Sequence, residues 1–217
     1  MPQVSAEIRW FLDAAHVAQV DDFTRWFRGG PLSAGGGRER RDVYAHDPST
    51  DEFGVKARGQ KPGVELKVLV VPLLGKTSLG AREATIQIWS KVTASIIAVP
   101  DARRTTRKVR WLRKFDTSGA TATEVKLEEL EEEPKSGPRL DIGCNAEWTS
   151  VSVDGNPRAW WTFGLEAFAF GSHGSVEATL EAGLRKALSA LEDRLGPAPA
   201  LGADWVEQSY PAWLRSL

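Results

Sequence analysis

Lysine, arginine and glutamate recur at alternate positions in several segments of this 217-residue chain. Lys56 and Arg58 are separated by one residue, and the same spacing separates Glu65 from Lys67. Because successive side chains of a β-strand point to opposite faces of a sheet, each pair would lie on one face of its strand. Cations gathered on one face repel one another unless counter-charges lie among them. The chemistry that this spacing predicts is therefore the electrostatic binding of an anion.

The alternation extends over most of the chain and divides the expected strands into two faces. One face is apolar, with residues such as Trp10, Ile88 and Trp148. The other face holds eight basic and four acidic side chains from seven expected strands. The basic set is Arg9, Lys56, Arg58, Lys67, Lys91, Lys108, Arg110 and Lys114, and the acidic set is Glu7, Glu65, Glu147 and Glu166.

Two architectures fit a sheet with one charged face. In an open antiparallel sheet this face would lie in water, which is common for such sheets. In a closed barrel it would line a wet lumen that favours anions. The charges here lie in the middle of the strands, such as Lys67 and Arg110, rather than at strand ends. The residues alone leave both architectures open.

Period-two alternation predicts nine strands, and apolar residues at helical spacing predict two helices. The helices are expected at Asp13–Phe27 and at Ser175–Leu195, where Ser175 is a suitable N-cap. The tail from Trp205 to Leu217 is expected to pack back onto the molecule. The strands are expected at residues 4–12, 40–46, 53–58, 63–71, 83–94, 106–116, 121–130, 139–153 and 158–170.

Length and composition, with 41% hydrophobic and 26% charged residues, predict one globular domain spanning residues 1–217. The net charge of −1 argues against a nucleic-acid-binding surface spread over the whole molecule. No apolar run is long enough to span a bilayer and no signal peptide is visible at the N-terminus, so we expect a cytoplasmic protein without a membrane partner. The sequence does not determine the oligomeric state.

The remaining residue types with possible chemistry have ordinary structural explanations. Nine tryptophans are expected mainly in the core. The single cysteine, Cys144, excludes an internal disulfide bond and lies on the apolar face, where it should be buried and inert. Asp42 and Tyr44 are expected either to orient basic neighbours or to satisfy each other's hydrogen bonds at a strand edge.

Three segments resemble the CYTH, or triphosphate tunnel metalloenzyme, superfamily. They are Arg41-Asp42-Val43-Tyr44, Gly54-Val55-Lys56-Ala57-Arg58 and Val64-Glu65-Leu66-Lys67. A basic strand around Lys108-Val109-Arg110, an acidic strand with Glu147 and a strand ending at Glu166 then follow in the family's order. Each segment alone is a weak signal, and their order along one strand face is moderately specific.

The resemblance implies an α+β fold, in which an antiparallel β-barrel of about eight strands encloses a charged tunnel with helices packed outside. It implies a metal-dependent phosphohydrolase whose small-molecule ligand is a nucleotide, thiamine or inorganic triphosphate or polyphosphate. By position it assigns Glu7 and Lys67 to catalysis. It assigns the phosphate to Arg9, Lys56, Arg58, Lys67, Lys91, Arg110 and Lys114, and a Mg²⁺ or Mn²⁺ ion to Glu7, Glu65, Glu147 and Glu166.

Two positions depart from the family pattern. The family's first strand reads E-x-E-x-K, whereas this chain has Ser5, Glu7 and Arg9, and the first of two late glutamates is replaced by Gly164. The loss of two carboxylates weakens the implied metal site. Other functions therefore stay open: a phosphate-binding module without catalysis, an enzyme like the class IV adenylyl cyclases, or an interaction protein with a charged face.

Overall fold

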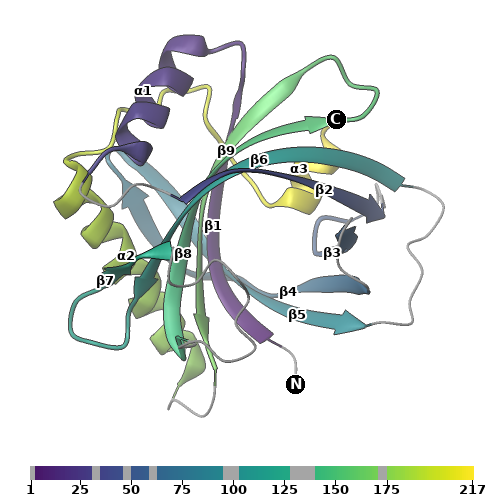
Figure 1. Cartoon of the computed structure of the whole chain (residues 1–217). Coiled ribbons are helices and arrows are strands. Elements are labelled where there is room, and N and C mark those ends of the chain that lie inside the picture. The colour runs from purple at the N-terminus through teal and green to yellow at the C-terminus, as the bar shows by residue number, and fades with distance from the viewer. Residues whose placement is uncertain are drawn as a thin grey trace.

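Eight antiparallel strands close into a barrel in the computed structural model (Figure 1). The structure describes residues 3–30, 35–45, 50–58, 63–94, 103–127, 140–170 and 175–217. Pairing of the first and last barrel strands closes the circle, so the predicted barrel is confirmed and the open sheet is excluded. In spatial order the strands are β1 (Gln3–Asp13), β5 (Arg82–Ala94), β4 (Val64–Leu79), β3 (Phe53–Arg58), β2 (Gly35–Ala45), β6 (Arg103–Asp116), β8 (Ile142–Val153) and β9 (Ala159–Ala169).

The strand register places the charged positions on the inner face of the wall. Glu7 of β1 is paired with Gln87 of β5 on one side and with Glu166 of β9 on the other. Residues paired in this way point to the same face of a sheet. Side chains two residues away from them, such as Arg9, share that face. The charged face predicted from the sequence is therefore the lumen.

Two strands differ in extent from the prediction. The strand expected at 63–71 continues as β4 to Leu79, with register shifts between Leu69 and Val71 and between Val71 and Gly75. The predicted strand ended at residue 71, directly before Pro72, which has no N–H to donate to a sheet. Strand β4 continues through Pro72 in an irregular stretch that is not paired with β5. The strand expected at 121–130 is only β7 (Thr123–Val125), which pairs with β6, and residues 128–130 lie outside the described part of the chain.

Helices α1 (Val17–Arg28) and α2 (Val176–Leu195) pack on the outside of the barrel. Helix α2 begins after the predicted N-cap, where the Ser175 hydroxyl accepts a hydrogen bond from the amide of Ala178 at 3.4 Å. Helix α1 begins later than predicted, because Asp13 is still part of β1 and its carboxylate accepts a hydrogen bond from the amide of Ala15. No helix in the described ranges is long and apolar enough to cross a membrane.

An aromatic cluster joins α1 to the outer face of the barrel. Phe23 of α1 lies 5.0 Å from Phe163 of β9 and 4.6 Å from Trp148 of β8, measured between ring centres. Trp10 stacks on Phe163 from the neighbouring strand, with ring centres 5.9 Å apart. Trp10 and Trp148 are fully buried, so the expectation that tryptophans serve the core holds at both positions.

The C-terminal tail folds over one end of the barrel. Its short strand β10 (Val206–Glu207) pairs with β1, and helix α3 (Tyr210–Arg215) follows. Trp213 of α3 stacks on Phe11 and packs edge-on against Trp160, two residues whose parity points into the lumen. The predicted packing of the tail is confirmed, and its apolar contacts at this end leave the charged part of the lumen deeper inside.

The aromatic cluster predicts a large loss of stability when its centre is truncated. Phe163→Ala removes a fully buried ring that contacts Trp10, Phe23 and Phe27, and we expect the free energy of unfolding to fall by about 3–5 kcal/mol. Urea unfolding measures this loss. Val17→Ala on the exposed side of α1 is the control and should change stability by less than about 0.5 kcal/mol; a similar loss in both variants would contradict the assignment of the core.

Candidate anion-binding site

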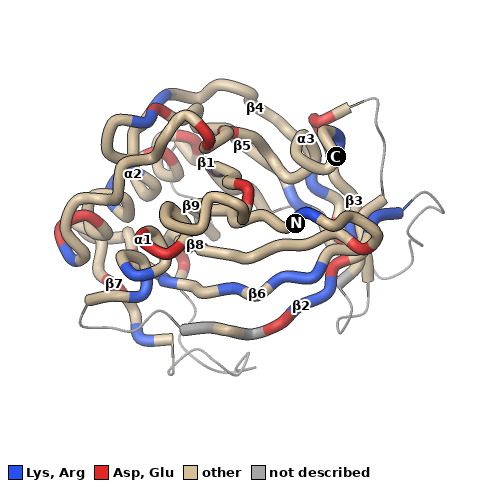
Figure 2. Tube along the Cα trace, turned by 90° about the horizontal axis from the view of Figure 1, so that it is seen from above, with Lys and Arg blue, Asp and Glu red and all other residues tan. Residues whose placement is uncertain are grey.

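The inward-facing charges line one polar cavity of about 230 Å³. Among the described residues, seven basic and four acidic side chains line it, so the lining carries a formal excess of three positive charges. Basic residues also gather along the neighbouring strands β2 and β6 (Figure 2). The basic side chains are Arg9, Arg40, Lys56, Lys67, Lys91, Lys108 and Arg110, and the acidic ones are Glu7, Glu65, Glu147 and Glu166.

Two arginines from two strands hold the carboxylate of Glu147. Arg110 donates a hydrogen bond to one oxygen at 2.7 Å, and Arg9 donates to the other at 3.4 Å. Burial alone would raise the pKa of Glu147. The positive charges outweigh burial, first Arg110, then Arg9 and Arg40, and hold this pKa far below its usual range. One carboxylate therefore serves two arginines, while the third, Arg40, bonds to Asp42.

Two buried polar atoms near this cluster lack a partner. Nε of Arg40 and Oγ1 of Thr149 are buried and have no hydrogen-bond partner within the described ranges. Both residues line the cavity, and Thr149 is paired in register with Arg110. Buried polar groups in proteins are usually satisfied, so these two atoms retain unused hydrogen-bonding capacity. The guanidinium groups of the cavity lining have the charge and the N–H donors to bind an oxyanion.

Gly164 explains how Arg9 reaches Glu147. Arg9, Gly164 and Glu147 form one row across β1, β9 and β8. The guanidinium of Arg9 crosses the strand between them, and a Cβ atom added at Gly164 would lie only 2.6 Å from its Cζ atom. The guanidinium is also held by a 3.2 Å hydrogen bond to Thr162 Oγ1 and lies 4.8 Å from the ring centre of Tyr210.

Glu7 is held by two neighbours. Its Oε1 atom accepts a hydrogen bond from the Ser5 hydroxyl at 2.7 Å, and its Oε2 atom accepts one from the ammonium of Lys67. Burial would raise the pKa of Glu7, but the charge and hydrogen bond of Lys67 outweigh burial and lower it. Glu166 lies beside Glu7 in the register, and its Oε1 atom is 3.6 Å from Lys91 Nζ.

Asp42 supports the basic residues of β2 and β6. Its carboxylate is fully buried and lies 3.2 Å from Lys108 Nζ and 3.0 Å from an Arg40 nitrogen. Lys108 also donates a hydrogen bond to the Tyr44 hydroxyl at 2.8 Å. Burial brings the pKa of Lys108 well below its usual range, and repulsion from Arg40 adds to this effect although Asp42 opposes it. Asp42 therefore orients basic neighbours, the first of its two expected arrangements.

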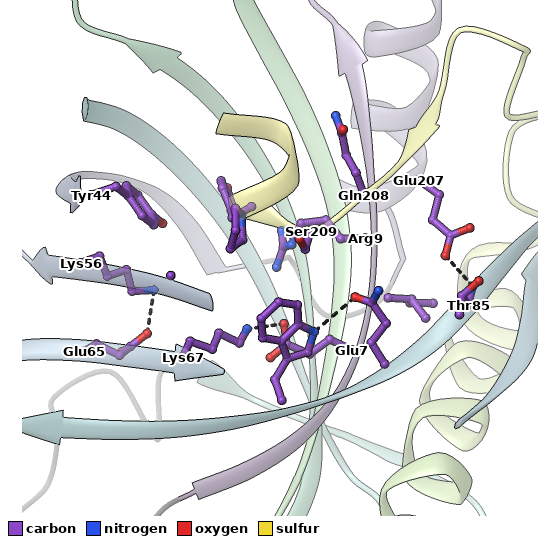
Figure 3. Close-up of a pocket in the computed structure, with 16 residues that line it drawn as sticks. Glu7, Arg9, Tyr44, Lys56, Glu65, Lys67, Thr85, Glu207, Gln208 and Ser209 are labelled. Atoms are coloured by element: carbon purple, nitrogen blue, oxygen red, sulfur yellow. Dashed lines mark hydrogen bonds and ion pairs between the residues drawn. The ribbon is translucent and has the colours of Figure 1, made fainter. Parts of the chain in front are cut away.

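A second cavity of about 300 Å³ adjoins the charged one and opens toward the C-terminal tail. The two cavities share several lining residues, including Arg9, Lys56 and Lys67. Figure 3 shows Lys56 beside Glu65 at this cavity, with their side chains 2.8 Å apart, and Lys67 beside Glu7. Its lining adds residues absent from the first cavity: the aromatic Trp89, the amides Gln87 and Gln208, the hydroxyl of Ser209 and the apolar Pro211.

The lumen gathers most of the residues that the sequence singled out. Two predicted ligands are exceptions. Lys114 is not among the described residues that line the charged cavity, and its Nζ lies 5.4 Å from the ring centre of Phe168. The side chain of Arg58 lies outside the described part of the structure. The predicted residues found in the lining are Glu7, Arg9, Lys56, Glu65, Lys67, Lys91, Arg110, Glu147 and Glu166.

Seven of the described residues that line the charged cavity were not predicted as ligands, among them Lys108, Arg40 and Tyr210. Lys108 had been placed on the charged face but not assigned to the ligand. Arg40 has the same parity as Asp42 and Tyr44 in the expected strand 40–46, and this signal would have identified it. Tyr210 comes from the tail, and no periodicity connects it with the strands.

Two of the four carboxylates in the cavity lining, those of Glu7 and Glu147, are already engaged by neighbouring side chains. Both oxygens of Glu7 and both oxygens of Glu147 already contact hydroxyl or cationic groups. The guanidinium of Arg9 fills the space where a side chain at position 164 would begin. Within the described ranges, no group of three or more His, Cys, Asp or Glu residues is arranged to hold a metal ion.

Comparisons with known proteins do not assign this chain to a family. No family model matches it, and no curated protein matches its sequence. Among solved structures, the chain is similar to the S. pombe Pct1 RNA triphosphatase in complex with the Spt5 CTD. The two chains are 12% identical, the match covers 92% of this chain and 87% of that chain, and the TM-score is 0.39. This likeness is too weak to carry an argument, and membership of the CYTH superfamily stays a prediction.

The lowered pKa of Glu147 predicts a pH-dependent contribution to stability. A carboxyl group whose pKa is lower in the folded state stabilises the fold above its unfolded pKa, about 4.3 for glutamate, and loses this contribution as the pH falls through the folded value. Glu147→Gln should therefore be less stable than the unmodified protein at pH 7, and the gap should narrow below about pH 4. Urea unfolding from pH 7 down to the lowest pH at which the protein stays folded measures the gap; a constant gap would contradict the ionised cluster.

Proposed function

We propose that the barrel binds a triphosphate or polyphosphate anion in its lumen. The observation that carries this proposal is the excess of basic over acidic side chains in the cavity lining, where Arg9 and Arg110 share a single carboxylate, Glu147. Guanidinium groups bind phosphate oxygens through paired hydrogen bonds and stay charged at all physiological pH values. An oxyanion entering the lumen would neutralise the charge that Glu147 leaves uncompensated.

The distribution of cations over several strands of the wall favours a chain of phosphates over a single one. The remaining cations lie on other strands of the wall, with Lys67 and Lys91 on one side of Glu7 and Glu166, and Lys56 beside Glu65. A single phosphate would neutralise the arginine cluster alone. A triphosphate carries several anionic oxygens that can contact cations from several strands at once, and each charge-assisted hydrogen bond adds to affinity.

Between hydrolysis and binding, the two functions with the most support from the sequence, the geometry favours binding. Metal-assisted phosphoryl transfer needs carboxylates that are available to hold the ion beside the phosphates. In this lumen Glu7 and Glu147 are engaged by Lys67 and by two arginines, and position 164 offers no carboxylate. The residues that are present can bind and orient phosphates without supplying a base or a metal.

Binding should depend on the inward-facing arginines and not on their outward-facing neighbours. Arg40→Ala removes a cation of the cavity, and we expect the Kd for tripolyphosphate to rise about tenfold or more. Arg41→Ala is the matched control, because this side chain follows directly in β2, points outward and pairs with Asp154. Isothermal titration calorimetry at low salt measures both; equal losses in the two variants would place the anion elsewhere.

Hydrolysis should be absent or close to background. Inorganic phosphate release is measured with tripolyphosphate, ATP, GTP and thiamine triphosphate, each with Mg²⁺ and with Mn²⁺. We expect no turnover above a protein-free control, because the carboxylates are engaged by cations. Clear turnover that is lost in Glu7→Gln would overturn this expectation and establish a metal-dependent phosphohydrolase instead.

A further inference from the structure

We infer that the guanidinium of Arg9 is a built-in cation that makes phosphate binding in this lumen independent of divalent metal. The inference rests on the proposed function, since it concerns how the same anion is held. Two positions determine this metal independence together: Arg9 supplies the cation, and Gly164 leaves room for it.

Geometry couples the two positions. Arg9 and Gly164 are paired in register on adjacent strands, and both point into the lumen. A Cβ atom at position 164 would lie 2.6–2.8 Å from three atoms of the Arg9 guanidinium, Cζ and both terminal nitrogens. Such distances are shorter than a van der Waals contact, so a side chain at position 164 would displace the Arg9 guanidinium from this place. The guanidinium has room here because position 164 is glycine.

The guanidinium is fixed in position and permanently charged. The Arg9 side chain is 11% exposed, and its guanidinium contacts Thr162, Glu147 and the ring of Tyr210. Burial would lower the pKa of Arg9, but the electrostatic influence of Tyr210 and Glu147 outweighs burial and raises it. A positive group that neither leaves nor loses its proton therefore faces the cavity.

Ser5, on the same strand as Arg9, also supports binding without a metal ion. Its hydroxyl donates a hydrogen bond to Glu7 instead of adding a second carboxylate to β1. This hydrogen bond engages Oε1 of Glu7, a residue that the resemblance assigns to a metal ion. Ser5 and Gly164 both leave the β1–β9 part of the wall without a further carboxylate, and the Arg9 guanidinium places a positive charge beside Gly164. Phosphate oxygens arriving there meet a fixed guanidinium in place of an exchangeable ion.

Calorimetric titration of the whole chain with tripolyphosphate, in EDTA and in Mg²⁺, tests the inference directly. We expect the affinity in EDTA to be equal to or higher than that in Mg²⁺, because free magnesium competes for the ligand and the lumen does not need it. Binding that appears only with Mg²⁺ or Mn²⁺ would overturn the inference while leaving the proposed function intact. No binding under either condition would remove the proposed function, and the inference with it.

A variant that keeps a positive charge at position 9 and adds a carboxylate at position 164 tests the coupling of the two positions. In Arg9→Lys/Gly164→Glu the smaller amine leaves room for a carboxylate, and we expect tripolyphosphate affinity in EDTA to fall at least tenfold. Titration of Mn²⁺ alone should then show saturable binding that the unmodified protein lacks. Arg9→Lys alone is the matched variant and should weaken the anion without creating metal binding. Metal binding by the unmodified protein as strong as that of the double variant would overturn the inference.

If the double variant does not fold, the result with the unmodified protein still decides the question. Arg158→Lys, an exposed arginine before β9, controls for arginine-to-lysine exchange as such and should leave both titrations unchanged. Far-UV circular dichroism of every variant confirms that the barrel is intact before each titration. A change of similar size in Arg158→Lys would show that the effect does not arise in the lumen.

Discussion

An uncompensated positive charge inside a closed wall is the constraint on which the remaining features of this molecule depend. Arg9 and Arg110 share the carboxylate of Glu147, and Asp42 is likewise shared between Arg40 and Lys108. Cations confined in a lumen repel one another strongly because the surrounding protein screens them less than water does. The barrel holds them in place because the strands that carry them are paired on both sides around the whole wall. The charge excess is thus a property of the closed architecture.

The outer and inner layers of the molecule have separate tasks. On the outside, aromatic side chains of α1, β8 and β9 form a core that stabilises the wall without touching the charged cavity. At one end, α3 buries apolar side chains that point into the lumen, such as Phe11 and Trp160. The outer apolar core that stabilises the barrel therefore lies apart from the charged cavity. Its stability allows the fold to tolerate repelling charges and unsatisfied polar atoms in the cavity.

Charge balance also connects the binding mode with the two positions that depart from the family pattern. Ser5 and Gly164 each lack a carboxylate, and Arg9 extends over the space at position 164. In the proposed binding mode, fewer carboxylates beside a retained cation favour phosphate oxygens over a metal ion. Arg9 and Gly164 are paired in the β1–β9 ladder, and Ser5 is paired with Phe168 farther along it.

The sequence by itself determined where most strands lie along the chain, the period-two alternation and hence which side chains share a face, because strand geometry allows only two directions for a side chain. Nine of the eleven residues predicted for the site line the charged cavity for this reason. The tertiary structure decided what alternation does not encode: that the sheet closes, which cation contacts which carboxylate, and that Lys114 lies apart from the cavity beside Phe168. It also brought Tyr210 of the tail over Arg9. These outcomes depend on register and on packing between distant segments, and neither is specified by the spacing of residues within one strand.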